Sequence, residues 1–154
     1  MRNGKGSPYE GGYRLPCIAR WPGKVPAGRK SDAVFATIDF MPTFAKLCGF
    51  NIPDDRKIDG IDQTDLLLGK SEKGRDTFYF DRAGMRMGKW KYLKADAHFY
   101  GYAREDERIE VDELYNLNKD LGETKNLALK NPGIVAKMRK LTEELPAYQP
   151  DEKR

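Results

Sequence analysis

The chain has 154 residues, which is enough for one ordinary domain with a core but too few for two large ones. Hydrophobic residues make up 39% and charged residues 34%, so the composition excludes a disordered chain. The formal net charge of +4 comes from 28 basic and 24 acidic residues that are intermixed, which argues only weakly for anionic partners and does not single out nucleic acid.

A glycine-rich loop opens the chain, NGKGSPYEGG at residues 3–12, and it suits neither a helix nor a strand. Lys5 stands between Gly4 and Gly6, which have no side chains. A tetrahedral anion could therefore approach both the Lys5 ammonium and the nearby backbone N–H groups. The loop lacks the preceding strand and glycine of a Walker phosphate loop, which argues against ATP binding. The alternative is a flexible N-terminal tail.

The apolar run LPCIARW at 15–21, closed by Trp-Pro-Gly, predicts a buried strand, and Cys17 and Cys48 are predicted to be buried free thiols. Residues 37–49 predict a helix that Thr37 or Asp39 can cap and that Gly49 ends. Its predicted core stripe consists of Phe40, Phe44 and Leu47.

The periodicity changes from helix to strand after a charged stretch, and we place a boundary near Gly74. Strands are predicted at 77–80, 84–87, 89–94, 98–103 and 109–115, with a hairpin turn at Gly88-Lys89. A final helix is predicted from Asn131 to Leu145, with Pro132 in its first turn and one apolar face that packs on the sheet. The second half is therefore a small antiparallel sheet with a packed helix.

Few side chains suggest catalysis. His98 is the sole histidine and lies in a predicted strand, where a structural or surface role is the simpler interpretation. No Cys/His cluster has zinc spacing, and the acidic clusters DDR, IDGID and REDER read as solvated loop charges. The chain by itself offers no assembled catalytic site.

Five blocks in order, from GKGSPYEGG through TIDFMPTFAKLCG, IDGIDQTDLLLG and RMGKWKYL to ELYNLNKDLGETKNLA, resemble the C-terminal part of type I sulfatases of the alkaline-phosphatase-like superfamily. The resemblance implies an α/β fold: residues 1–74 would end the catalytic α/β domain, and residues 75–154 would form a C-terminal subdomain. Asn116 and Leu121 depart from the family pattern at turn positions, where Asp and Pro are usual.

The same resemblance implies site residues. Lys5 would contact the sulfate of the substrate, flanked by Gly4 and Gly6, because a cation neutralises charge on the transferring group. Glu10, Gly11 and Gly12 would shape the loop, and Asp39, Pro42 and Thr43 would be structural.

Sulfatases also use a formylglycine nucleophile and a Ca²⁺ ion, whose motif and ligands this sequence lacks. We expect no cofactor or metal within this segment, Ca²⁺ and formylglycine in the full-length enzyme, and no turnover by the chain alone. The expected partners are a sulfate ester (sulfated glycan or aryl sulfate), the missing N-terminal catalytic region and further copies of the chain. We expect no binding to nucleic acid or to a membrane. The resemblance also implies a periplasmic or secreted enzyme.

Two other functions stay open. Lys89 and Lys91 alternate with Trp90 and Tyr92 on a predicted strand, which would suit a stand-alone polyanion-binding module, although alternation also fits an aromatic core with solvated lysines. The same superfamily includes phosphatases and phosphodiesterases, and a loop lysine does not discriminate phosphate from sulfate.

Overall fold

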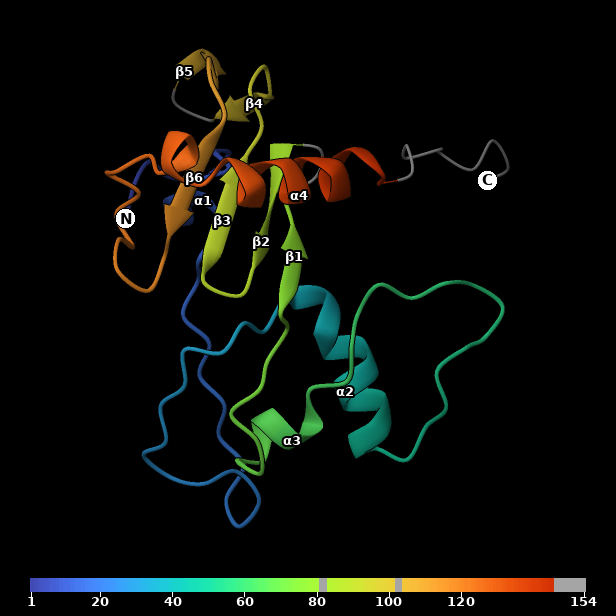
Figure 1. Cartoon of the computed structure of the whole chain (residues 1–154). Helices are drawn as coiled ribbons and strands as arrows, with labels where there is room; N and C mark the ends of the chain where they lie inside the picture. Colours follow the sequence, from blue (N-terminus) through green and yellow to red (C-terminus); the bar gives the residue numbers. More distant parts are fainter. Residues whose placement is uncertain (81–82, 102–103, 146–154) are drawn as a thin grey trace. The chain divides into compact units, whose positions relative to one another are not determined.

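The computed structural model describes residues 1–80, 83–101 and 104–145 (Figure 1). The chain forms two compact units, Met1–Leu15 with Tyr79–Arg154 and Pro16–Phe78, which we call the sheet unit and the helical unit. The opening loop thus groups with the second half of the chain. The division into residues 1–74 and 75–154 concerns the domains of a longer protein and stays a prediction.

The sheet unit is built on a four-stranded sheet in the order β1-β2-β3-β6. The strands of this sheet are β1 (Thr77–Tyr79), of which Tyr79 belongs to the sheet unit, and β2 (Gly84–Met87), β3 (Trp90–Leu93) and β6 (Glu113–Asn116). Strands β2 and β3 pair antiparallel across the turn Gly88-Lys89, where Gly88 has a φ of +55°, and β6 pairs antiparallel with β3. The predicted hairpin is confirmed.

A separate two-stranded sheet contains β4 (His98–Gly101) and β5 (Arg104–Arg108), which pair antiparallel. The prediction of REDER as a loop is wrong, because this segment is β5: it has no apolar alternation, and its pairing with β4 is what makes it a strand. The predicted strand at 109–115 begins only at Glu113. Residues 102–103 of the predicted strand at 98–103 lie outside the described residues.

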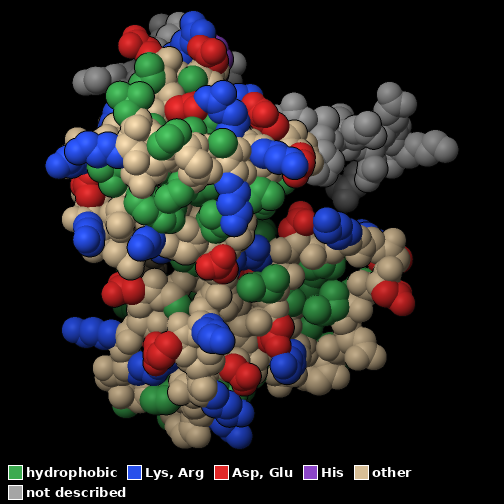
Figure 2. All heavy atoms as spheres, viewed as in Figure 1, with side chains coloured by type: hydrophobic (Ala, Val, Ile, Leu, Met, Phe, Trp, Pro, Cys, Tyr) green, Lys and Arg blue, Asp and Glu red, His purple; other side chains and the backbone are tan. Residues whose placement is uncertain are grey.

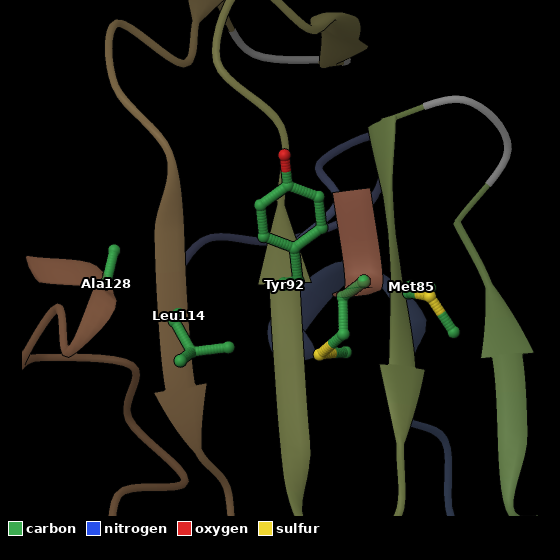
Figure 3. Close-up of a cluster of buried hydrophobic side chains, with 5 residues drawn as sticks. Met85, Tyr92, Leu114 and Ala128 are labelled. Carbon is green, nitrogen blue, oxygen red and sulfur yellow. The ribbon is translucent and has the colours of Figure 1, made fainter. Parts of the chain in front are cut away.

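The core of the sheet unit lies between the sheet and α4 (Pro132–Glu143), which packs across β2 and β3 (Figure 1). Tyr92 faces Met85 on one neighbouring strand and Leu114 on the other, so the three form a row across the sheet. Figure 3 shows this row with Ala128 of η3 (Ala128–Lys130); Met138 of α4 completes the buried cluster. The predicted packing of the last helix on the sheet is confirmed, although the helix ends two residues before Leu145.

The helical unit contains η1 (Thr37–Asp39), α2 (Phe40–Leu47) and α3 (Thr64–Leu67), joined by long loops (Figure 1). Gly49, which follows the C-cap residue Cys48 of α2, has the predicted left-handed conformation with a φ of +73°. Neither predicted cap residue makes a capping hydrogen bond to this helix. The predicted core stripe is also wrong: Phe44 is 50% exposed, and the buried residues of α2 are Pro42 and Thr43. Phe40 and Leu47 are half-buried, and the ring of Phe40 packs 4.9 Å from that of Phe35, so the described part of this unit covers the apolar face only in part.

Residues 14–21 form no strand, which corrects the prediction of a buried one. Leu15 is 77% and Ile18 is 92% exposed, and the thiols of Cys17 and Cys48 are exposed instead of buried. An apolar run becomes a strand only when a neighbouring strand accepts its backbone hydrogen bonds, and the described residues provide none here.

Candidate functional site

The opening loop (residues 3–12) is folded back on itself. The Ser7 N–H donates to the carbonyl of Gly4 at 3.1 Å, and the Gly11 N–H donates to the carbonyl of Arg2 at 3.0 Å, which brings the two ends of the loop together. Gly6 has a φ of +91°, a conformation that favours glycine. Lys5 lies at the exposed tip, within the turn that the Gly4–Ser7 bond closes.

Two further glycines allow this close folding. A Cβ on Gly11 would lie 2.0 Å from the carbonyl oxygen of Asn3, and a Cβ on Gly12 would lie 2.1 Å from that of Ser7. No side chain fits at these distances, so the loop can take this shape only with glycine at both positions. The role in loop shape that the resemblance implied for Gly11 and Gly12 agrees with this geometry.

A buried charge cluster, formed by Glu10, Lys91 and Glu123, lies beneath the loop. The Lys91 ammonium lies 3.0 Å from Glu10 Oε1 and 2.8 Å from Glu123 Oε1. All three side chains are at most 4% exposed. The cluster joins the loop to β3 and to the turn that follows β6, from positions 81 and 113 residues away along the chain.

The two carboxyls respond differently to burial. Burial alone would raise the pKa of Glu10, but the Lys91 ammonium and the Arg14 guanidinium, which lies 3.1 Å from Glu10 Oε2, hold it below its usual value. Burial raises the pKa of Glu123, although Lys91 opposes this shift. Glu10 is therefore the more strongly held anion of the two.

A second set of contacts holds the start of the loop. The Arg2 guanidinium donates to the hydroxyl of Tyr115 at 2.9 Å and stacks 3.8 Å over the centre of the Tyr9 ring. The Tyr9 hydroxyl donates to Glu113 Oε2 at 2.8 Å. Since Tyr115 and Glu113 both belong to β6, this strand holds the start of the loop on the sheet face opposite α4.

The structure places the predicted site residues in two groups. Lys5 lies exposed with Gly4 and Gly6 in the loop, whereas His98 lies exposed at the start of β4. Lys91, predicted to be solvated, is fully buried, which removes one of the two lysines on which the polyanion-binding alternative depended. On the face shown in Figure 2, Lys and Arg side chains are interspersed with Asp and Glu, so that face has no extended patch of one sign.

The described residues contain no group of three or more His, Cys, Asp and Glu side chains that could hold a metal ion. The calcium ion that the resemblance implies for the full-length enzyme therefore finds no set of ligands among these residues. By itself, the loop can offer a cation and unhindered backbone to an oxyanion, which is a binding role.

Residues 4–151 match the family model for N-sulphoglucosamine sulphohydrolase, C-terminal. This chain belongs to the sulfatases. The match begins at Gly4 and so includes the opening loop, both units and the buried charge cluster. The resemblance that the sequence blocks suggested is confirmed.

Sulfatases are also found among individual relatives. The chain is 30% identical to arylsulfatase G of Rattus norvegicus over 92% of its length, and 32% identical to N-acetylgalactosamine-6-O-sulfatase of Bacteroides thetaiotaomicron over 94%. It spans 29% of the length of each of these relatives.

Solved structures show the same fold. A Bacteroides thetaiotaomicron structure described with the metabolism of multiple glycosaminoglycans superposes with a TM-score of 0.79 at 33% identity, covering 92% of this chain and 31% of that one. A sulfatase from Pseudoalteromonas sp. superposes with a TM-score of 0.73 at 26% identity, with the same coverage of 92% and 31%. The predicted α/β class, with a small antiparallel sheet and packed helix, is confirmed.

Proposed function

We propose that this chain acts as the C-terminal portion of a sulfatase that hydrolyses sulfate esters, with Lys5 contacting the substrate sulfate. The observation that carries the proposal is the placement of Lys5 at the exposed tip of a folded loop that is anchored from below by buried charges. A lysine on a disordered tail would lose conformational entropy on binding an anion, whereas this loop is already ordered.

The chemical role of Lys5 is electrostatic. When a sulfate ester is cleaved, negative charge develops on the departing oxygen, and a positioned ammonium stabilises that charge. Gly4 and Gly6 leave the ammonium and the backbone N–H groups accessible to the sulfate oxygens. Loss of one such charge-stabilising group costs about 10²-fold in rate.

The remaining chemistry requires groups beyond this chain. In the proposed full-length enzyme, formylglycine would supply the nucleophile and Ca²⁺ would polarise the sulfate, both held by residues outside this segment, and the isolated chain would show no turnover. The exposed apolar side chains of Leu15, Ile18 and Phe44 support contact with that region, or self-association when it is absent.

The substrate class is a sulfate ester of a glycan or an aryl alcohol, since the relatives include an arylsulfatase and an N-acetylgalactosamine-6-O-sulfatase. A periplasmic or secreted location is part of the proposal. Among the helices that the structure describes, none is long and apolar enough to cross a membrane.

The experiment measures sulfate release from p-nitrophenyl sulfate and from a 6-sulfated N-acetylgalactosamine glycan. The enzyme is expressed with all coding sequence that precedes Met1 in frame, and the 154-residue chain is assayed beside it. Activity of the longer protein alone would support the proposal. Hydrolysis of p-nitrophenyl phosphate without sulfate release would instead favour the phosphatase alternative.

Replacement of Lys5 by alanine is expected to lower kcat/KM for sulfate release by about 10²-fold, because the ammonium no longer stabilises the developing charge. Lys5→Arg should recover part of this loss. Lys119→Ala is the matched control, since Lys119 is an exposed lysine of the same unit. Unchanged kcat/KM in Lys5→Ala would contradict the role of Lys5.

A further inference from the structure

Glu123 contacts both ends of the opening loop. Its Oε2 accepts the backbone N–H of Glu10 at 2.7 Å, and its backbone carbonyl accepts the Arg2 guanidinium at 3.4 Å. The Gly11 N–H closes the same loop by donating to the carbonyl of Arg2. Residues 2 and 10 are thus fixed at a single point, and Lys5 lies on the segment between them.

The hydrogen bond from the Glu10 N–H to Glu123 lies at the N-terminus of a helix. Glu10 is the first residue of α1 (Glu10–Tyr13), so its N–H has no partner within the helix, and the side chain of the preceding residue makes no capping bond. The Glu123 carboxylate therefore caps α1 from a distant part of the sequence. A negative charge at this position also interacts favourably with the unpaired N–H groups at the N-terminal end of α1.

The backbone of Glu123 supports a specific role for its side chain. Its φ is +54°, in the left-handed region, which strains a residue with a Cβ and favours glycine. Glutamate nevertheless occupies the position, with a fully buried side chain. The contacts of the carboxylate with Glu10 and Lys91 offset this cost.

Lys91 completes the connection. Its ammonium bridges Glu123 Oε1 and Glu10 Oε1 from the centre of the sheet, where Lys91 pairs with Arg86 of β2 and Tyr115 of β6. Central strands are the most rigidly held part of a sheet. The loop is thereby tied to a central strand of the sheet.

We propose that Glu123 and Lys91 are positioning residues that set the place of Lys5, so that the C-terminal subdomain controls the geometry of the sulfate contact. The catalytic consequence rests on the proposed function of Lys5, whereas the structural part does not. A displacement of about 1 Å at a reacting group is enough to lower the rate strongly.

The first test uses amide hydrogen exchange in the 154-residue chain and is independent of catalysis. In Glu123→Gln, the amides of Gly6 to Gly12 should exchange about tenfold faster than in the wild type, while those of β3 keep their protection. Glu123→Ala should show a larger effect, because glutamine still offers an oxygen to the Glu10 N–H. Glu144→Gln, at an exposed carboxylate in the same unit, is the control. Unchanged exchange in the loop would overturn the proposal.

The second test is a double-mutant cycle on sulfate release by the longer enzyme. Glu123→Gln should lower kcat/KM about tenfold when Lys5 is present and less than about twofold in the Lys5→Ala background, because the two residues then act through one contact. Equal losses in both backgrounds would show general structural damage and overturn the positioning role. If Lys5→Ala itself has no effect, the proposed function fails while the exchange result still stands.

Discussion

Replacement of Lys91 by methionine is expected to lower the free energy of unfolding of the sheet unit by about 3–5 kcal/mol. Methionine keeps the length and apolar stem of the side chain but leaves Glu10 and Glu123 buried without their shared cation. The ammonium also lies 4.5 Å from the centre of the Phe80 ring, and that favourable contact is lost as well.

Urea unfolding, followed by the fluorescence of Trp90 in a Trp21→Phe background, measures this unit alone, because the chain has two tryptophans and Trp21 lies in the other unit. Lys89→Met is the control at the neighbouring exposed lysine and should change the free energy by less than about 1 kcal/mol. A loss of stability below about 1 kcal/mol for Lys91→Met would contradict the prediction, because it would mean that Glu10 and Glu123 are not buried as charged groups that depend on Lys91.

A compensated variant separates charge from packing. If the cost of Lys91→Met comes from unpaired carboxylates, then adding Glu10→Gln and Glu123→Gln should recover part of the stability, because neutral amides cost less to bury than ions. If the loss comes from packing, the extra substitutions should make it worse.

Local patterns predicted the elements whose contacts are themselves local. The hairpin of β2 and β3 followed from a two-residue turn between two short apolar segments, and α4 followed from its proline start and helical spacing. Both have a covered apolar face within the sheet unit, so periodicity and burial agree.

Periodicity could not show whether an apolar face is covered. The run at 15–21 and the stripe with Phe44 have the patterns of buried elements, yet their side chains are exposed. A pattern gives the tendency of a segment to be buried, but burial also requires a second layer, which the described residues do not supply for these segments.

The anchoring of the site was not predictable from local sequence. Alternation correctly places Lys91 on the face opposite Tyr92 but predicts that this face is solvated, whereas Lys91 is buried there against Glu10 of the opening loop. The partners of Lys91 lie in the first turn of α1 and in a loop after β6. Contacts between residues so far apart in the chain produce no periodic pattern in the sequence, so they could not be predicted from it. The position of Lys5 in the loop was recognisable from its flanking glycines, and its contact with sulfate stays a prediction.

Asp39 has an equivalent role in the helical unit, and replacing it with alanine is expected to cost that unit about 3–5 kcal/mol. The side chain is fully buried, and its oxygens accept the backbone N–H groups of Ala36 and Ile61, each at 2.9 Å, as well as the guanidinium of Arg75. Alanine would leave both backbone donors without this acceptor, and Arg75, whose side chain is 12% exposed, would lose its carboxylate partner and keep the carbonyl of Asp59. The unit has few other buried contacts that could compensate.

The buried carboxyl of Asp39 should also make the stability of the helical unit depend on pH. Burial alone would raise the pKa of Asp39, but Arg75 and the backbone N–H groups of Ile61 and Ala36 hold it below the usual 3.8. A carboxyl whose pKa is lower in the folded state stabilises the fold at pH values above 3.8, and this contribution is lost as the pH falls through the lower, folded value. The helical unit should therefore lose stability below about pH 4.

Unfolding of the helical unit, followed by Trp21 fluorescence in a Trp90→Phe background between about pH 7 and pH 2, measures both effects. Asp39→Asn should be less stable than the wild type at neutral pH and should show a flatter dependence on pH, because asparagine does not titrate. Asp55→Asn is the control: its carboxylate pairs with the adjacent Arg56 at an exposed position, where solvent screens the pair. If Asp39→Asn and the wild type lose stability in parallel as the pH falls, other carboxyls determine acid unfolding, and the buried carboxylate of Asp39 is not the centre of this unit.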